Sequence, residues 1–91
     1  MADPAIVSCT KNAWTKIATS VTGGRYYVKN GNVKYVRTYN ATGTGTPADS
    51  DVDKAIRVNS SDEGNEINSD SNVDVYVWVY GDENGSIITE L

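Results

Sequence analysis

The sequence predicts an all-β domain, a small antiparallel β-sandwich or barrel, and both composition and patterning indicate this class. The aliphatic residues are mostly β-branched, with 11 Val and 6 Ile against 1 Leu. Such side chains suit a pleated, half-buried surface, whereas helical cores depend on Leu, Met and Ala. Several short segments alternate apolar and polar residues with a period of two, and Gly, Pro and Asn separate them. No segment has the 3.6-residue apolar period of a helix.

The length of 91 residues suffices for a single domain. Residues 1–12 mix small and polar side chains with Pro4, and they lack the apolar periodicity of a folded element. They predict a short extended N-terminal arm, either loose or docked on a neighbour, in front of one β domain at 13–91.

The first strand of this domain is predicted over 13–21, where two glycines end it. The segment 25–39 then contains the strongest local signal. Its Asn30-Gly31 pair suits a two-residue type I′ turn, because both central positions of that turn need φ > 0. A hairpin about this turn would pair Val28 with Val33 on one face.

The middle of the chain is predicted to hold one strand between two long loops. Gly and Pro punctuate the loop at 40–51, and the strand at 52–58 alternates again. The second loop, 59–72, is acidic and rich in Asn and Ser, with a short strand at 66–68 as an option.

The clearest strand is predicted over 73–80, followed by a turn and a closing strand at 86–91. Its four alternate valines predict a core-facing surface. The reverse face carries Tyr76, Trp78 and Tyr80, and it is too aromatic to be left bare in a soluble monomer. Either a second layer of the same sandwich or a partner should cover it, and small sandwiches often cannot cover both faces of a sheet. We therefore expect Trp78 to lie in a subunit contact or beneath the N-terminal arm.

Aromatic side chains are the candidate interface residues. They are Trp14, Tyr27, Tyr76, Trp78 and Tyr80. Aromatic residues are enriched both in cores and at protein interfaces, which favours burial or contact with a second subunit. The alternative is a flat platform for sugars formed by Trp14, Tyr27 or Tyr80.

Catalysis and metal binding have little support in the sequence. The chain has no His and a single Cys, Cys9, which excludes a Ser-His-Asp set and a thiolate metal cage. Asp49-x-Asp51-x-Asp53 opens like a calcium-binding EF-hand loop, but Lys54 and Ser60 occupy the positions that require Gly and Glu. We expect no enzyme activity, no catalytic residue and no cofactor; calcium binding by the acidic loops stays open.

Charge and hydropathy indicate which partners and compartments to expect. A net charge of −4 argues against a nucleic-acid surface. The N-terminus has neither a basic region nor an apolar stretch of signal-peptide length, and no run is long enough for a membrane span. We expect no membrane insertion, no signal peptide and a start in a cytosol.

Short motifs in their order along residues 13–91 resemble the small β-sandwich modules of tailed-bacteriophage virions, which are accessory proteins of the capsid surface, head fibre or tail. They are Trp14-Thr15-Lys16-Ile17-Ala18, Gly23-Gly24-Arg25-Tyr26-Tyr27-Val28-Lys29-Asn30, Thr46-Pro47-Ala48-Asp49, Val77-Trp78-Val79-Tyr80-Gly81 and Ile87-Ile88-Thr89-Glu90.

This resemblance implies a non-enzymatic virion protein that decorates or cements the capsid. It would assemble as a homo-oligomer, with a trimer favoured, on the major capsid or tail proteins. The alternative function is a receptor- or carbohydrate-binding β module at a phage tail or head fibre, with a host surface glycan as its partner. Capsid and tail locations are not distinguished.

Overall fold

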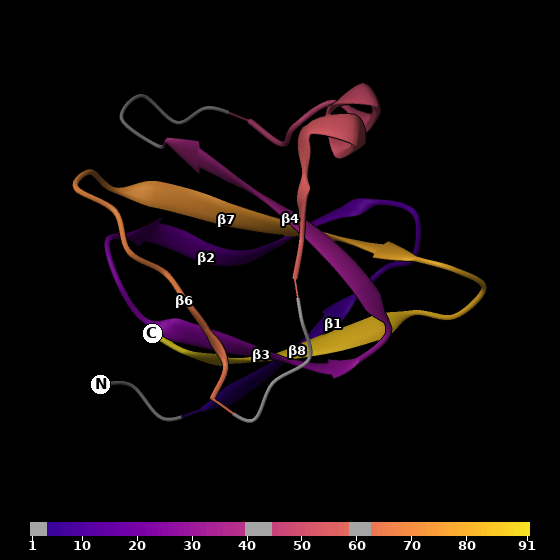
Figure 1. The fold of residues 1–91 in the computed structure, drawn as a ribbon, viewed down its shortest axis with the longest axis horizontal. Coiled ribbons are helices and arrows are strands. Elements are labelled where there is room, and N and C mark those ends of the chain that lie inside the picture. Colours follow the sequence, from indigo (N-terminus) through magenta and orange to yellow (C-terminus); the bar gives the residue numbers. More distant parts are fainter. Residues whose placement is uncertain (1–3, 40–44, 59–62) are drawn as a thin grey trace.

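Two four-stranded antiparallel sheets pack face to face (Figure 1). The structure is a computed structural model, and it describes residues 4–39, 45–58 and 63–91. Sheet 1 has the strand order β1-β8-β3-β6, and sheet 2 has the order β2-β7-β4-β5. The elements are β1 (Ala5–Cys9), β2 (Trp14–Val21), β3 (Arg25–Asn30), β4 (Asn32–Tyr39), the 3-10 helix η1 (Asp49–Lys54), β5 (Ile56–Arg57), β6 (Asn65–Glu66), β7 (Val73–Tyr80) and β8 (Gly85–Glu90). The predicted all-β sandwich is confirmed.

The core lies between the sheets, and β7 contributes most to it. The four alternate valines of β7 have no exposed surface, which confirms the predicted core face. Sheet 1 supplies Tyr26 from β3 and Ile87 from β8, and both are fully buried opposite the valines. Because these side chains are β-branched or aromatic, they fill the space between two pleated surfaces without a helix.

The predicted hairpin at Asn30-Gly31 is wrong, although both of its strands form. β3 pairs with β8 and β6 in sheet 1, whereas β4 pairs with β7 and β5 in sheet 2. Gly31 has φ +95°, but Asn30 is not among the described residues with positive φ, so the turn is not type I′. The chain crosses from one sheet to the other at Gly31. Val28 and Val33 still both reach the core, from opposite sheets.

Residues 5–9 of the predicted extended N-terminal arm are docked on the domain as a strand. Strand β1 forms an edge of sheet 1, antiparallel to β8, with Val7 beside Ile87 and Cys9 beside Gly85. Val7 packs on the core and Cys9 is buried in it. The alternation of Val7 and Cys9 with Ile6 and Ser8 is short, so the sequence signal for a strand is weak there.

The segment predicted as a strand at 52–58 begins instead with η1. The Asp51 side chain accepts a hydrogen bond from the backbone N–H of Ala48 at 3.2 Å, and this contact fixes the first turn. Only Ile56 and Arg57 pair as a strand, with β4. The optional strand at 66–68 is found only at Glu66, because β6 spans Asn65–Glu66.

Candidate functional site

The outer face of sheet 2 carries a cluster of three aromatic rings. Trp14 on β2 stands opposite Trp78 on β7, with ring centroids 5.4 Å apart and an interplanar angle of 71°. Tyr80, two residues further along β7, also contacts Trp78, with the ring centroids 6.5 Å apart. The edge-to-face angle is the one that aromatic quadrupoles favour. Trp78 is thereby only 7% exposed.

The segment before η1, which contains Ala48, is hydrogen-bonded to this aromatic cluster. The indole N–H of Trp14 donates a 3.0 Å hydrogen bond to the carbonyl oxygen of Ala48. Figure 1 shows η1 at the top, on the side of sheet 2 that faces away from sheet 1. Residues 5–9 of the predicted N-terminal arm do not cover Trp78, because they form β1 in the opposite sheet.

A buried carboxylate extends the covered face along β7. Asp74 is 1% exposed, and its carboxylate accepts a 3.0 Å hydrogen bond from the backbone N–H of Ser20 and pairs with Lys16 at 3.5 Å. Lys16 also lies over the ring of Tyr76, 5.6 Å from its centroid. Partial burial lowers the pKa of Lys16, but Tyr76 and Asp74 outweigh it, so the pKa is raised above its ordinary value.

Four of the predicted interface residues therefore lie together on one face, but that face needs no partner to cover it. Tyr76 and Trp78 are buried within one chain, and Trp14 and Tyr80 are half-buried. Of the two options that the sequence left open, burial within one chain and contact with a second subunit, the first holds for Tyr76 and Trp78. Sequence periodicity gave the face correctly, but it could not show that the chain covers the face itself.

Tyr27, the fifth predicted residue, lies on the outer face of sheet 1. It stands beside Ile88 on β8, and Ile88 stands beside Ile6 on β1. A Cβ at Gly64 would lie 2.6 Å from the Tyr27 ring, so only glycine allows this close approach. A hydrogen bond to Glu90 raises the pKa of the Tyr27 hydroxyl. Ile6, at the edge of this row, is 62% exposed.

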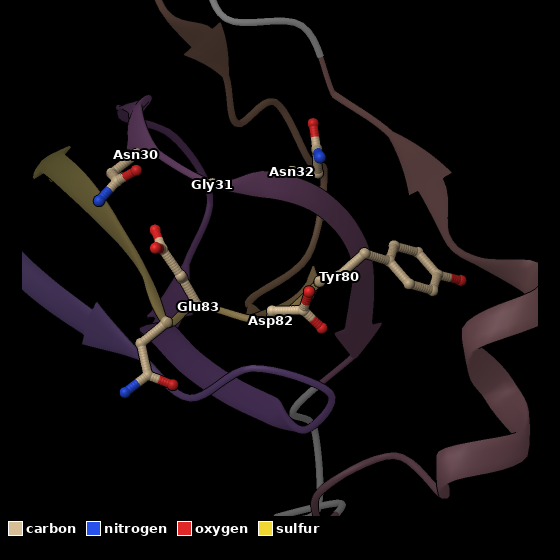
Figure 2. A pocket seen from close by; sticks show the side chains of 8 residues that line it. Asn30, Gly31, Asn32, Tyr80, Asp82 and Glu83 are labelled. Atoms are coloured by element: carbon tan, nitrogen blue, oxygen red, sulfur yellow. The ribbon is translucent and has the colours of Figure 1, made fainter.

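A polar pocket of about 370 Å³ opens at the end of the sandwich where the chain crosses between sheets (Figure 2). We call it the crossover pocket. Its lining comes from two crossings, the one at Gly31 and the one between β7 and β8. The lining residues are Asn30, Gly31, Asn32, Tyr80, Gly81, Asp82, Glu83 and Asn84. The sequence patterns predicted both segments only as turns.

The segment that joins β1 to β2 forms hydrogen bonds with the β7–β8 turn that lines this pocket. The backbone N–H of Lys11 donates to the side-chain oxygen of Asn84 at 3.0 Å, and the Lys11 ammonium donates to the carbonyl of Asp82 at 2.9 Å. The side-chain amide of Asn12 donates to the carbonyl of Gly81 at 3.2 Å. These bonds use the turn's backbone and one amide, and they leave the carboxylates of Asp82 and Glu83 available.

Among the described residues, neither the single cysteine nor the acidic side chains form a further candidate site. Burial raises the pKa of the Cys9 thiol to about 11, which disfavours the reactive thiolate. Among the residues that the structure describes, no group of three or more His, Cys, Asp or Glu side chains is placed to hold a metal ion. Within the same ranges, no helix is long and apolar enough to cross a membrane.

Comparison with known proteins adds no relative to this description. No family model, no curated protein and no solved structure matches the chain.

Proposed function

We propose that this chain is a non-enzymatic structural protein of a tailed-bacteriophage virion, of the capsid-decoration or cementing kind, which assembles as a homo-oligomer on the particle surface. The resemblance of residues 13–91 to phage β-sandwich modules supports the virion setting. The self-assembly is supported by a structural observation, the unprotected edge strand β1 with its exposed Ile6.

The four edge strands differ in how well they resist pairing with another chain. β5 and β6 have two residues each, and β2 is interrupted by two register shifts and carries Lys16. Short length, bulges and lysine are the usual protections of a sheet edge. β1 has none of these, because its five residues, Ala-Ile-Val-Ser-Cys, are uncharged and pair with β8 without a register shift.

A second copy of this chain is the partner that β1 fits. In an antiparallel pair centred on Val7, Ile6 of each copy would stand opposite Ser8 of the other, so no like charges would meet. The outer faces of the two sheets would then be continuous. The exposed Ile6 and the half-exposed Ile88 beside it would give an apolar contact next to the new backbone hydrogen bonds.

Light scattering on the purified chain over a range of concentrations tests the self-assembly. We expect a multimeric mass, and we expect Ile6→Lys to shift the chain to a monomer. Ile56→Lys is the matched control, because Ile56 is equally exposed, at 63%, but lies on the short edge strand β5. A wild-type monomer at all concentrations, or the same loss of mass from both variants, would contradict the assignment to β1.

The measured mass also distinguishes two modes of assembly. A two-fold β1–β1 contact gives a dimer, whereas the trimer favoured by the resemblance needs β1 to meet a different surface of the next copy. The virion setting is tested by imaging particles assembled with and without this protein. Density that is lost from the particle surface would support it, and identical particles would contradict it.

A further inference from the structure

We propose that the crossover pocket binds a neutral sugar, with the carboxylates of Asp82 and Glu83 accepting hydrogen bonds from its hydroxyl groups. The pocket is formed within one chain, so this inference does not depend on the oligomer proposed above. This pocket is a different candidate sugar site from the flat aromatic platform considered in the carbohydrate-binding alternative.

The first support is a set of polar side chains without protein partners. Asn30, Asn32, Asp82 and Glu83 all line the pocket, and in the described part of the chain their side chains make no hydrogen bond or ion pair. Figure 2 shows the Glu83 side chain extending toward Asn30 and the Asp82 carboxylate between Glu83 and Tyr80. These polar side chains thus come from two segments of the chain, 30–32 and 80–84, which line one hollow.

The second support is the chemistry of this set. Carboxylates only accept hydrogen bonds, whereas side-chain amides donate and accept them. Neighbouring hydroxyl groups on a sugar ring can satisfy both kinds of partner at once. Two carboxylates disfavour an anionic ligand such as a phosphate, because like charges repel. Tyr80 also lines the pocket, but its ring extends away from Asn30 and Glu83 (Figure 2) and lies beside Trp78, so the polar groups carry the recognition.

The third support is that the pocket is held in shape before any ligand arrives. Lys11 and Asn12 hold the backbone of the 81–84 turn, as described above. On the other side, a Cβ at Gly31 would lie 3.1 Å from a methyl group of Val79 and 3.2 Å from the Cα of Gly85, so the two crossings are closely packed. A pre-organised site loses less entropy on binding. Its volume lies in the range of ordinary ligand pockets and accommodates a single sugar ring.

Nuclear magnetic resonance titration of the ¹⁵N-labelled full chain tests the inference. The probes are glucose, galactose, mannose and N-acetylglucosamine, each added to high millimolar concentration. We expect at least one of them to give saturable shifts of the backbone amides of Gly31, Asn32 and residues 81–84. No saturable shift with any of the four sugars, or shifts confined to other parts of the chain, would overturn the proposal.

Charge-matched variants then identify the groups that bind. Asp82→Asn and Glu83→Gln should each weaken binding of the responding sugar by about tenfold or more, since each loses a charge-assisted hydrogen bond. Asp53→Asn removes the same charge from an exposed position on η1 and should leave the affinity unchanged. Equal weakening by all three variants would overturn the proposed contacts.

A calcium titration without sugar separates this inference from cation binding. We expect calcium chloride to leave the pocket amides unshifted and EDTA to leave the sugar response intact. Saturable calcium shifts at Asp82 and Glu83, together with loss of the sugar response in EDTA, would show that the pocket is a cation site and would overturn direct recognition by the carboxylates.

Discussion

Trp14 and Trp78 lie opposite each other on β2 and β7 in an edge-to-face contact, yet their indole N–H groups differ in environment. The N–H of Trp14 donates to the carbonyl of Ala48, whereas the N–H of Trp78 is buried and has no hydrogen-bond partner among the residues that the structure describes. The two residues therefore have separate roles. Trp14 joins the segment before η1 to sheet 2, and Trp78 contributes mainly buried apolar area.

This difference predicts opposite outcomes for two matched substitutions in limited proteolysis. Trp14→Phe removes the hydrogen bond that holds Ala48, so trypsin should cleave faster after Lys54 and Arg57, which are both exposed. Trp78→Phe leaves that bond in place. Under conditions where the two variants have the same free energy of unfolding, it should not accelerate this cleavage. Equal acceleration in both variants would show that the Trp14 hydrogen bond does not hold the segment.

Trp78→Ala should lower the free energy of unfolding by roughly 3–5 kcal/mol, since it leaves a large cavity beneath Trp14 and Tyr80. Because Trp78 is buried within one chain, the variant should keep the wild-type oligomeric mass under conditions where it is folded. Chemical denaturation and light scattering measure the two quantities. Dissociation without loss of monomer stability would place Trp78 at a subunit contact instead.

Gly31→Ala should destabilise the protein strongly, because Gly31 has φ +95° and a Cβ there would meet Val79 and Gly85. The backbone conformation alone costs about 1–2 kcal/mol for an L-residue. Gly45→Ala is the control, since nothing lies within 4 Å of its added Cβ and its φ is not in the positive range. Urea midpoints of the two variants make the comparison, and similar midpoints would contradict the close crossing at Gly31.

Cys9 should make stability fall as the solution becomes alkaline. Burial raises the pKa of its thiol from 9.0 to about 11, so the unfolded state loses its proton first as the pH rises. The stability present below pH 9 is lost between pH 9 and 11, and a two-unit difference corresponds to roughly 2–3 kcal/mol. Comparison with Cys9→Ala isolates this effect from the tyrosines. An identical pH profile for both proteins would show that the thiol is not shielded.

The positions of the strands were more predictable from the sequence than the pairing between them. The alternating valines of 73–80 require only that one face of a strand be buried, and that holds whichever strands lie beside it. The hairpin prediction failed because an Asn-Gly pair between two apolar segments is compatible with a two-residue turn and with a crossing between sheets. The choice depends on whether β3 and β4 pair with each other or with β8 and β7, and those partners are distant in sequence.

The candidate site was predictable only in part, for a related reason. Trp14, Tyr76, Trp78 and Tyr80 share a face that periodicity identifies. The crossover pocket combines Asn30 and Asn32 with Asp82 and Glu83, and it exists because two crossings meet at one end of the sandwich. No local pattern contains this information, since each segment by itself has the composition of an ordinary surface turn.

The crossings between sheets also bear on how quickly the chain reaches its native state. Only β4 and β5 are both consecutive along the chain and paired in a sheet; among the other described strands, each pairing joins distant segments. In such topologies the chain loses loop-closure entropy before the strand pairs form and stabilise it. Proteins of this kind fold on the scale of milliseconds to seconds. Among the described strands, β8 is the sole partner of β1 and the main partner of β3. A nascent chain therefore cannot complete sheet 1 until residues 85–90 have left the ribosome. Until then the uncharged β1 segment is without its partner, and this is the interval in which we expect the chain to be most prone to aggregation.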